Sequence, residues 1–166
     1  MNKTVKLGLL AVLGCTMIFS SGCGRSNRSD NIKCINNLKI YGLGIMMYID
    51  DNGDKYPDDL AAVSKYTDNF ADSCRAGKTK YVYFGGKLTV KSLKDPAKTP
   101  TMICYNNHAA NCNVLFADGH VESLMLKQKK FSSCRDAVKN VIDHIGLKDL
   151  QTVEMLLNNA DKADHK

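Results

Sequence analysis

The stretch N-N-H-A-A-N-C-N-V-L-F-A-D-G-H-V-E-S-L, residues 106–124, decides the fold because it predicts a β-hairpin. Residues 112–117 form an apolar run, and residues 120–126 alternate apolar and polar side chains. Asp118-Gly119 lies between these two segments. An Asp-Gly pair in this position favours a type I′ turn, which needs positive φ at both central residues. We therefore expect two antiparallel strands joined at Asp118-Gly119.

Three further segments are strand-like. Residues 80–84 and 87–90 flank Gly85-Gly86, which predicts a second hairpin, and residues 102–105 form a short apolar run. These segments and the hairpin together predict an antiparallel sheet.

The chain before the sheet has a helical period. Between residues 30 and 51, apolar side chains recur at steps of three and four residues, which predicts a helix with one apolar face. Asp30 is the expected N-cap, and Asn52-Gly53 suits a left-handed C-cap. Residues 58–66 predict a short second helix. The apolar positions of the first helix are Ile35, Leu38, Tyr41, Ile45, Tyr48 and Ile49.

The helical period returns after the sheet. Residues 131–145 predict a helix capped by Ser132 or Ser133 and ended by Gly146. Residues 148–160 predict a second amphipathic helix, after which the chain is expected to fray. The expected fold class is α+β: a long N-terminal helix packed on an antiparallel sheet, with a C-terminal helical hairpin.

The first 22 residues resemble an export signal. Lys3 and Lys6 precede an apolar run at residues 7–19, and S-S-G-C resembles a bacterial lipobox with Cys23 as the lipidated residue. V-L-G-C, residues 12–15, is a rival lipobox, and a plain secretory signal with an incidental cysteine is a second alternative. The expected product is an exported lipoprotein, anchored in a membrane of a bacterial cell envelope.

The remaining charge argues against a nucleic-acid-binding protein. Removal of residues 1–22 lowers the formal net charge from +6 to +4, since it removes Lys3 and Lys6. The basic residues are dispersed, apart from the short run at residues 127–130, whereas a nucleic-acid site needs a basic patch. No nucleic-acid partner is expected.

Two motifs resemble those of a known group of proteins. The segment C-I-N-N-L-K-I-Y-G-L-G-I-M-M-Y-I-D-D-N-G-D-K-Y-P, residues 34–57, is similar to type IV pilin-like and pseudopilin-like proteins. His108, nine intervening residues and Asp118-Gly119 match the H-x9-D-G motif of the prepilin-type processing-associated domain. The two motifs bracket residues 34–126, in the order found in that group.

The resemblance implies a pilin-like head and a non-enzymatic role. It implies a structural or interaction subunit related to type IV pilus or type II secretion pseudopilins, with envelope or secretion-system proteins as partners. The prepilin leader is missing, and the lipoprotein-type signal stands in its place. The expected organisation is a signal peptide at residues 1–22, a flexible tether at 23–30, the pilin-like domain at 31–130 and a helical appendage at 131–166.

Histidines and cysteines near the hairpin raise the question of a metal. Cys104, His108, Cys112 and His120 supply four nitrogen and sulfur ligands of the kind that zinc binds. In the alternative interpretation, His108 only hydrogen-bonds the backbone or Asp118 and fixes the loop. A module that binds a metal or a glycan at the His108–Asp118 end is therefore the second functional hypothesis.

Calcium is the other metal to consider. Asp50, Asn52 and Asp54 offer oxygen ligands, but Lys55 and Ala61 stand where an EF-hand needs glycine and glutamate. These residues alternatively form only the helix C-cap.

The remaining cysteines suggest an oxidising compartment. Without Cys15 and Cys23, five cysteines remain, and the preferred disulfides are Cys34–Cys74 and Cys104–Cys112, with Cys134 left over. In a reducing envelope all five would be plain thiols. The chain has no phosphate-binding loop, H-E-x-x-H or G-x-S-x-G motif, so no enzyme is expected.

Overall fold

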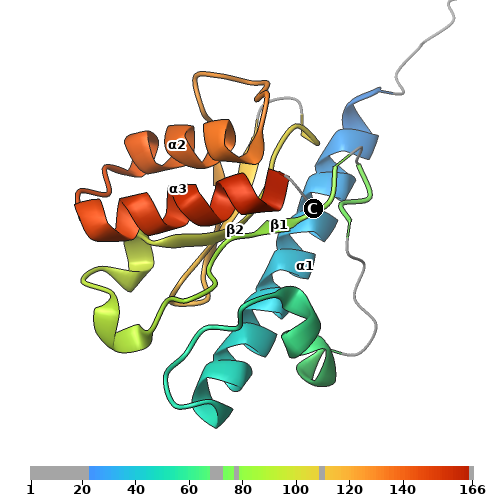
Figure 1. Ribbon diagram of the computed structural model, residues 1–166. Coiled ribbons are helices and arrows are strands. Elements are labelled where there is room, and N and C mark those ends of the chain that lie inside the picture. The colour runs from blue at the N-terminus through green and yellow to red at the C-terminus, as the bar shows by residue number, and fades with distance from the viewer. Residues whose placement is uncertain (1–22, 68–72, 77–78, 109–110, 165–166) are drawn as a thin grey trace, which may run out of the picture.

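The computed structural model describes residues 23–67, 73–76, 79–108 and 111–164, and it has the expected α+β class. A four-stranded antiparallel sheet, in the order β1-β2-β3-β4, lies between one long helix and a pair of shorter ones (Figure 1). The α-helices and strands are α1 (Cys23–Asp51), β1 (Val82–Tyr83), β2 (Pro100–Cys104), β3 (Cys112–Phe116), β4 (Val121–Leu124), α2 (Cys134–Ile145) and α3 (Leu150–Asp164). The short 3-10 helices are η1 (Leu60–Tyr66), η2 (Val90–Ser92) and η3 (Pro96–Lys98).

The predicted hairpin at Asp118-Gly119 is confirmed, but its turn type is different. The Phe116 amide donates to the His120 carbonyl at 2.9 Å, and the Gly119 amide donates to the Phe116 carbonyl at 3.0 Å. Within this turn, Gly119 has a positive φ of 88°, whereas Asp118 does not. This is a three-residue loop with glycine in the left-handed position, and not the two-residue type I′ turn that we expected.

The second predicted hairpin is wrong. β1 lies within predicted residues 80–84, but residues 87–90 do not pair with it. Instead, Lys55 and Thr89 form an isolated bridge, and the Tyr56 amide donates to the Leu88 carbonyl at 3.0 Å. β1 pairs with β2, which lies later in the sequence. Gly85-Gly86 is therefore a bend that returns the chain toward the end of α1.

α1 begins earlier than the sequence predicts. It includes the stretch 23–30 that was expected to be a flexible tether, so Asp30 lies inside the helix and is not its N-cap. The physical reason is that this polar stretch contains no proline, and a helix nucleated by the packed part of α1 extends at little cost. At the other end, Gly53 and Asp54 adopt positive φ, and the Asp54 amide donates to the Ile49 carbonyl at 3.1 Å, which confirms the predicted C-cap.

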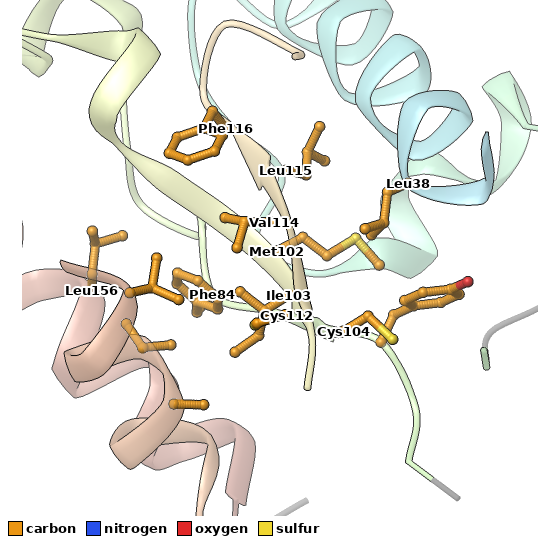
Figure 2. Packing of buried hydrophobic residues seen from close by; sticks show 14 of the residues in the cluster. Leu38, Phe84, Met102, Ile103, Cys104, Cys112, Val114, Leu115, Phe116 and Leu156 are labelled. Carbon is orange, nitrogen blue, oxygen red and sulfur yellow. The ribbon is translucent and has the colours of Figure 1, made fainter. Parts of the chain in front are cut away.

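The two faces of the sheet contact different helices. Met102, Leu115 and Leu38 of α1 lie on one side of β2 and β3, whereas Val114 and Leu156 of α3 lie on the other (Figure 2). Every residue of β2 and β3 is buried, as expected for central strands covered on both faces.

α2 and α3 form the layer over the second face. Ser133 caps α2 by accepting from the Asp136 amide at 3.0 Å, and Gly146 ends the helix with φ 70°, as predicted. α3 does not fray at residue 161. It continues to Asp164, whose carboxylate accepts from the Cys134 amide at 2.7 Å and so binds the start of α2. Among the described helices, none combines the length and apolar character needed to cross a membrane.

Candidate metal centre

Four potential metal ligands converge between α1 and one end of the sheet. They are Cys34, Cys74, Cys104 and His108, and their ligand atoms all lie within 4.8 Å of one another. The three cysteines are buried and the histidine is partly buried. This is the one group of three or more such ligands that the described residues form.

Each ligand is positioned by a different segment. Cys34 lies on the buried face of α1, one turn before Leu38. Cys104 is the last residue of β2, and it points toward α1 because it is in register with Asn113, whose side chain binds Asn31 of α1 at 2.8 Å. Sequence positions far apart are therefore joined by the packing of the helix on the sheet.

The other two ligands come from the connecting segments. Cys74 follows Ser73, which forms an isolated antiparallel bridge with Lys80. His108 lies in the loop between β2 and β3, and its Nε2 is 3.3 Å from the Cys74 sulfur. Asn106 opens this loop with φ 59° and exchanges two hydrogen bonds with Phe131, at 2.8 and 2.9 Å. The loop is thereby held against the chain that leads into α2.

The spacing of the four atoms suits a tetrahedral ion. With Zn–S of about 2.3 Å and Zn–N of about 2.0–2.1 Å, ligand atoms lie roughly 3.5–3.8 Å from one another. The observed limit of 4.8 Å is wider by about 1 Å, and the Cys74–His108 distance of 3.3 Å is slightly shorter. Side-chain rotations of this size would bring three sulfurs and one nitrogen around a single zinc ion.

Amide and phenol groups surround the sulfurs. The Asn107 side chain donates to the Cys104 sulfur at 3.2 Å, and it also binds the Thr79 amide and carbonyl at 3.0 and 2.9 Å. Asn113 and Tyr81 hydrogen-bond toward Cys34. Such donors orient thiolate ligands and partly neutralise their charge.

Within the cluster the pKa values of Cys34 and Cys74 are lowered, whereas those of Cys104 and His108 are raised. The pKa of Cys34 is lowered to about 4, mainly by hydrogen bonding from Cys104 and to a smaller extent by the His108 ring, against the effect of burial. Hydrogen bonding from Cys104 also lowers the pKa of Cys74. The pKa of Cys104 is raised, because this thiol donates to Cys34 and Cys74. The cluster thus stabilises thiolate, the form in which cysteine binds zinc, at Cys34 and Cys74. Zinc binding would displace the protons that Cys104 and His108 favour.

The structure brings together only half of the predicted zinc ligands. Cys104 and His108 belong to the cluster, whereas Cys112 lies on the opposite face of the sheet, where it contributes to the environment of Cys134. His120 follows the hairpin turn at the far end of β3, stacks on Phe116 with ring centroids 4.4 Å apart and contacts Asp118 through Nδ1 at 2.5 Å. The ligand set is therefore corrected by replacing Cys112 and His120 with Cys34 and Cys74.

The predicted disulfides are not formed. Cys34, Cys74, Cys104, Cys112 and Cys134 are all free thiols. Cys104 and Cys112 lie on adjacent strands but point to opposite faces, since side chains alternate along a strand and Cys104 is in register with Asn113. Cys34 and Cys74 do lie together, but each also contacts Cys104 and His108. A disulfide between Cys34 and Cys74 would remove two of the four potential metal ligands.

His108 and Asp118 do not form one site. They flank β3 at opposite ends, so the expected contact between them is absent, and Asp118 instead binds the His120 ring and amide. Two of the residues considered for calcium make other contacts. The Asn52 side chain donates to the Tyr48 carbonyl of α1 at 2.7 Å, and Asp54 forms an ion pair with Lys91 at 3.5 Å.

Two of the four ligands, Cys34 and Cys74, were not predicted from the sequence, where they were expected to form a disulfide. Two sequence features bear on which ligands meet: the helical spacing of apolar residues in α1, and the alternation of side chains along the strands. Cys34, Leu38 and Tyr41 recur at helical steps on the apolar face, which directs Cys34 toward the sheet. Cys104 and Cys112 are separated by a loop. The length of that loop does not fix the strand register, so the sequence did not show that the two side chains lie on opposite faces of the sheet. Cys74 lies in an irregular segment, for which the sequence offers no such signal.

Comparison with known proteins does not identify a relative. No family model, no curated protein and no solved structure matches this chain.

Proposed function

We propose that this chain is a non-enzymatic structural module of a bacterial cell envelope, and that a zinc ion bound by Cys34, Cys74, Cys104 and His108 fastens its fold. The observation that carries the proposal is the convergence of these four ligand atoms within 4.8 Å. Three cysteines and one histidine form one of the ligand sets typical of structural zinc sites.

Zinc at this position has a structural rather than a catalytic character. A catalytic zinc keeps a coordination position open for water or substrate, whereas four protein ligands leave none open. The three sulfurs are almost completely buried, with Cys34 and Cys104 at 0% exposure and Cys74 at 3%. A substrate would therefore have little access to the ion.

The ion would add a direct link between segments that are otherwise joined by hydrogen bonds and packing. Cys74 and His108 lie in irregular segments, and Cys34 and Cys104 lie on the helix and the sheet. Because the unfolded chain has no preformed site, the free energy of zinc binding adds to the stability of the fold.

The placement of this module in the envelope is a further part of the proposal. The lipobox-like sequence at Cys23 and the H-x9-D-G motif support an exported, lipid-anchored, pilin-like head. The long α1 against an antiparallel sheet is compatible with that architecture. Within the motif, His108 would be a zinc ligand, and Asp118-Gly119 would form the turn at the other end of β3.

The test is metal content and mass of the purified full-length protein. We expect native mass spectrometry to find one zinc per chain, and chelation to lower the melting temperature. Cys104→Ala should lose the zinc. The matched control is Cys112→Ala, which removes an equally buried thiol from the adjacent strand but faces the other side of the sheet; it should retain the zinc.

Two outcomes would contradict the proposal. One is a protein that folds and contains no zinc when purified without chelator. The other is a mass two daltons lower than that of the reduced chain, with a peptide that links Cys34 and Cys74, which would assign these thiols to a disulfide.

A further inference from the structure

α1 is apolar on two opposite sides. One side packs on the sheet through Cys34, Leu38, Tyr41, Ile45 and Ile49. The other carries large apolar side chains in solvent: Leu43 is 64% exposed, Ile32 50%, Met47 45% and Ile40 36%. At about 100° per residue, these four and Asn36 fall within a stripe roughly 80° wide, on the side of the helix away from the buried face. We call Ile32, Asn36, Ile40, Leu43 and Met47 the outer stripe.

The outer stripe has the spacing of a helix–helix seam. Asn36, Ile40, Leu43 and Met47 are separated by four, three and four residues, which is the alternation of core positions in a coiled coil. A helix that is part of a folded domain needs only one apolar side. The second one therefore calls for a partner helix.

Charges at the two ends of the stripe distinguish a parallel from an antiparallel partner. Lys33 lies one heptad before Ile40, and Asp50 lies one heptad after Leu43, so the same seam starts with a cation and ends with an anion. Neither residue forms an ion pair within the part of the chain that the structure describes. In a parallel pair of identical helices, Lys33 would face Lys33 and Asp50 would face Asp50.

In an antiparallel pair, one register places opposite charges, rather than like charges, against each other. When Ile40 of one copy faces Leu43 of the second, Asn36 faces Met47 and Lys33 faces Asp50. A twofold axis between Ile40 and Leu43 then repeats every contact, as closed homodimers require.

We propose that two copies of this chain associate through the outer stripe as an antiparallel helix pair in this register. Exposed ion pairs contribute little to affinity, so the apolar residues supply the affinity and the charges set the direction. The seam is short, and we expect a reversible dimer rather than a permanent one. The inference is independent of the zinc site, which lies against the buried face of α1.

The test is sedimentation velocity of the purified full-length protein over a range of concentrations. The wild-type chain should show a concentration-dependent monomer–dimer equilibrium. Leu43→Lys should shift it to monomer. Met125→Lys is the control, since Met125 is more exposed, at 73%, but lies outside α1; it should leave the equilibrium unchanged. Zinc content and circular dichroism establish that each variant is folded.

Charge reversal tests the orientation. Lys33→Asp and Asp50→Lys should each weaken the dimer several-fold, and the double variant should restore it, because only the antiparallel register places these residues opposite each other. Single variants that leave the dimer unchanged would overturn the antiparallel arrangement. A wild-type chain that stays monomeric at all concentrations, or that instead binds neutral phospholipid vesicles through Leu43, would overturn the proposal as a whole.

Discussion

At the residue scale, the most informative contacts are those that hold the ligands in place. The Asn107 side chain donates to the Cys104 sulfur and binds both backbone groups of Thr79. It thus joins the thiol of β2 to the segment that follows Cys74. A metal site depends on such contacts, because they fix the ligand before the ion arrives.

We expect Asn107→Ala to lower the zinc affinity about 10- to 100-fold, which is the usual effect of removing such a contact. Competition with a chromogenic chelator measures this change. Asn111→Ala is the control, because Asn111 belongs to the same loop but donates to Ser123, outside the cluster. Equal affinities in the two variants would contradict the positioning role of Asn107.

A second residue-scale prediction concerns acid stability. The Lys94 ammonium, 2.6 Å away, and the Thr152 hydroxyl lower the pKa of Asp149 from 3.8 to about 2. A carboxylate with a lowered pKa in the folded state stabilises the protein above its unfolded pKa. This contribution is complete above about pH 4 and is lost as the pH falls toward 2.

Wild type should therefore melt at a higher temperature than Asp149→Asn above pH 4, and the difference should vanish near pH 2. Both proteins lose zinc in acid, so the difference between them isolates Asp149. Asp143→Asn, an exposed carboxylate on α2, serves as the control. A difference that persists unchanged at pH 2 would show that the charge of Asp149 is not its cause.

Residue types alone identified two of the four ligands. Cys104 and His108 stand out because zinc-binding residues cluster around the hairpin, and the same argument wrongly included Cys112 and His120. The choice among neighbours depends on which face of the sheet each side chain occupies. That information appears only when the register is known: Cys104 opposite Asn113 places Cys112 on the far face.

At the scale of the element, α1 packs tightly against η1 and Thr67 at Gly44. An added Cβ at Gly44 would lie 2.4 Å from Thr67 Cγ2 and 2.7 Å from Val63 Cγ1. Thr67 cannot easily move, because its hydroxyl donates to the Val63 carbonyl at 3.1 Å. Glycine at position 44 therefore serves close packing.

Gly44→Ala should destabilise the protein, although alanine favours a helix by about 1 kcal/mol over glycine. Overpacking costs about 1–3 kcal/mol, and so it outweighs that gain. Thr67→Ser deletes the nearer clashing methyl and keeps the hydroxyl. The double variant should therefore be more stable than the sum of the single changes predicts, as measured by denaturant unfolding. Additive effects would show that Gly44 is not limited by Thr67.

Local patterns predicted elements well where the pattern was long and poorly where pairing was non-local. The period of α1 and the Ser133 and Gly146 caps of α2 were evident in the sequence. The predicted pairing of residues 87–90 with 80–84 was wrong, because Leu88 and Thr89 bind residues 55 and 56, which follow α1. Short-range turn signals cannot reveal a partner thirty residues away.

At the scale of the whole molecule, the three layers meet in one core, but the two ends of the sheet are held differently. At one end, the Asp118-Gly119 turn joins β3 to β4, and the Tyr56 hydroxyl donates to the Ala117 carbonyl at 2.6 Å. At the other end, irregular segments that carry Cys74 and His108 close over Cys34 and Cys104. The first end is closed by a hairpin turn, whereas at the second end hydrogen bonds of Asn106 and Asn107 and the four-ligand cluster together hold two irregular segments in place.

This asymmetry predicts where the protein opens when zinc is removed. Hydrogen exchange of the purified protein, with and without a chelator, should show lost protection at residues 32–38 and 101–104. Protection at the turn, residues 115–121, and in α2 should change little, because these parts have their own hydrogen bonds and apolar contacts. Cys104→Ala without chelator should reproduce the pattern, and Cys112→Ala should not. A uniform loss of protection along the chain would mean that the ion stabilises the fold as a single cooperative unit, and no change at all would mean that the cluster does not bind the ion.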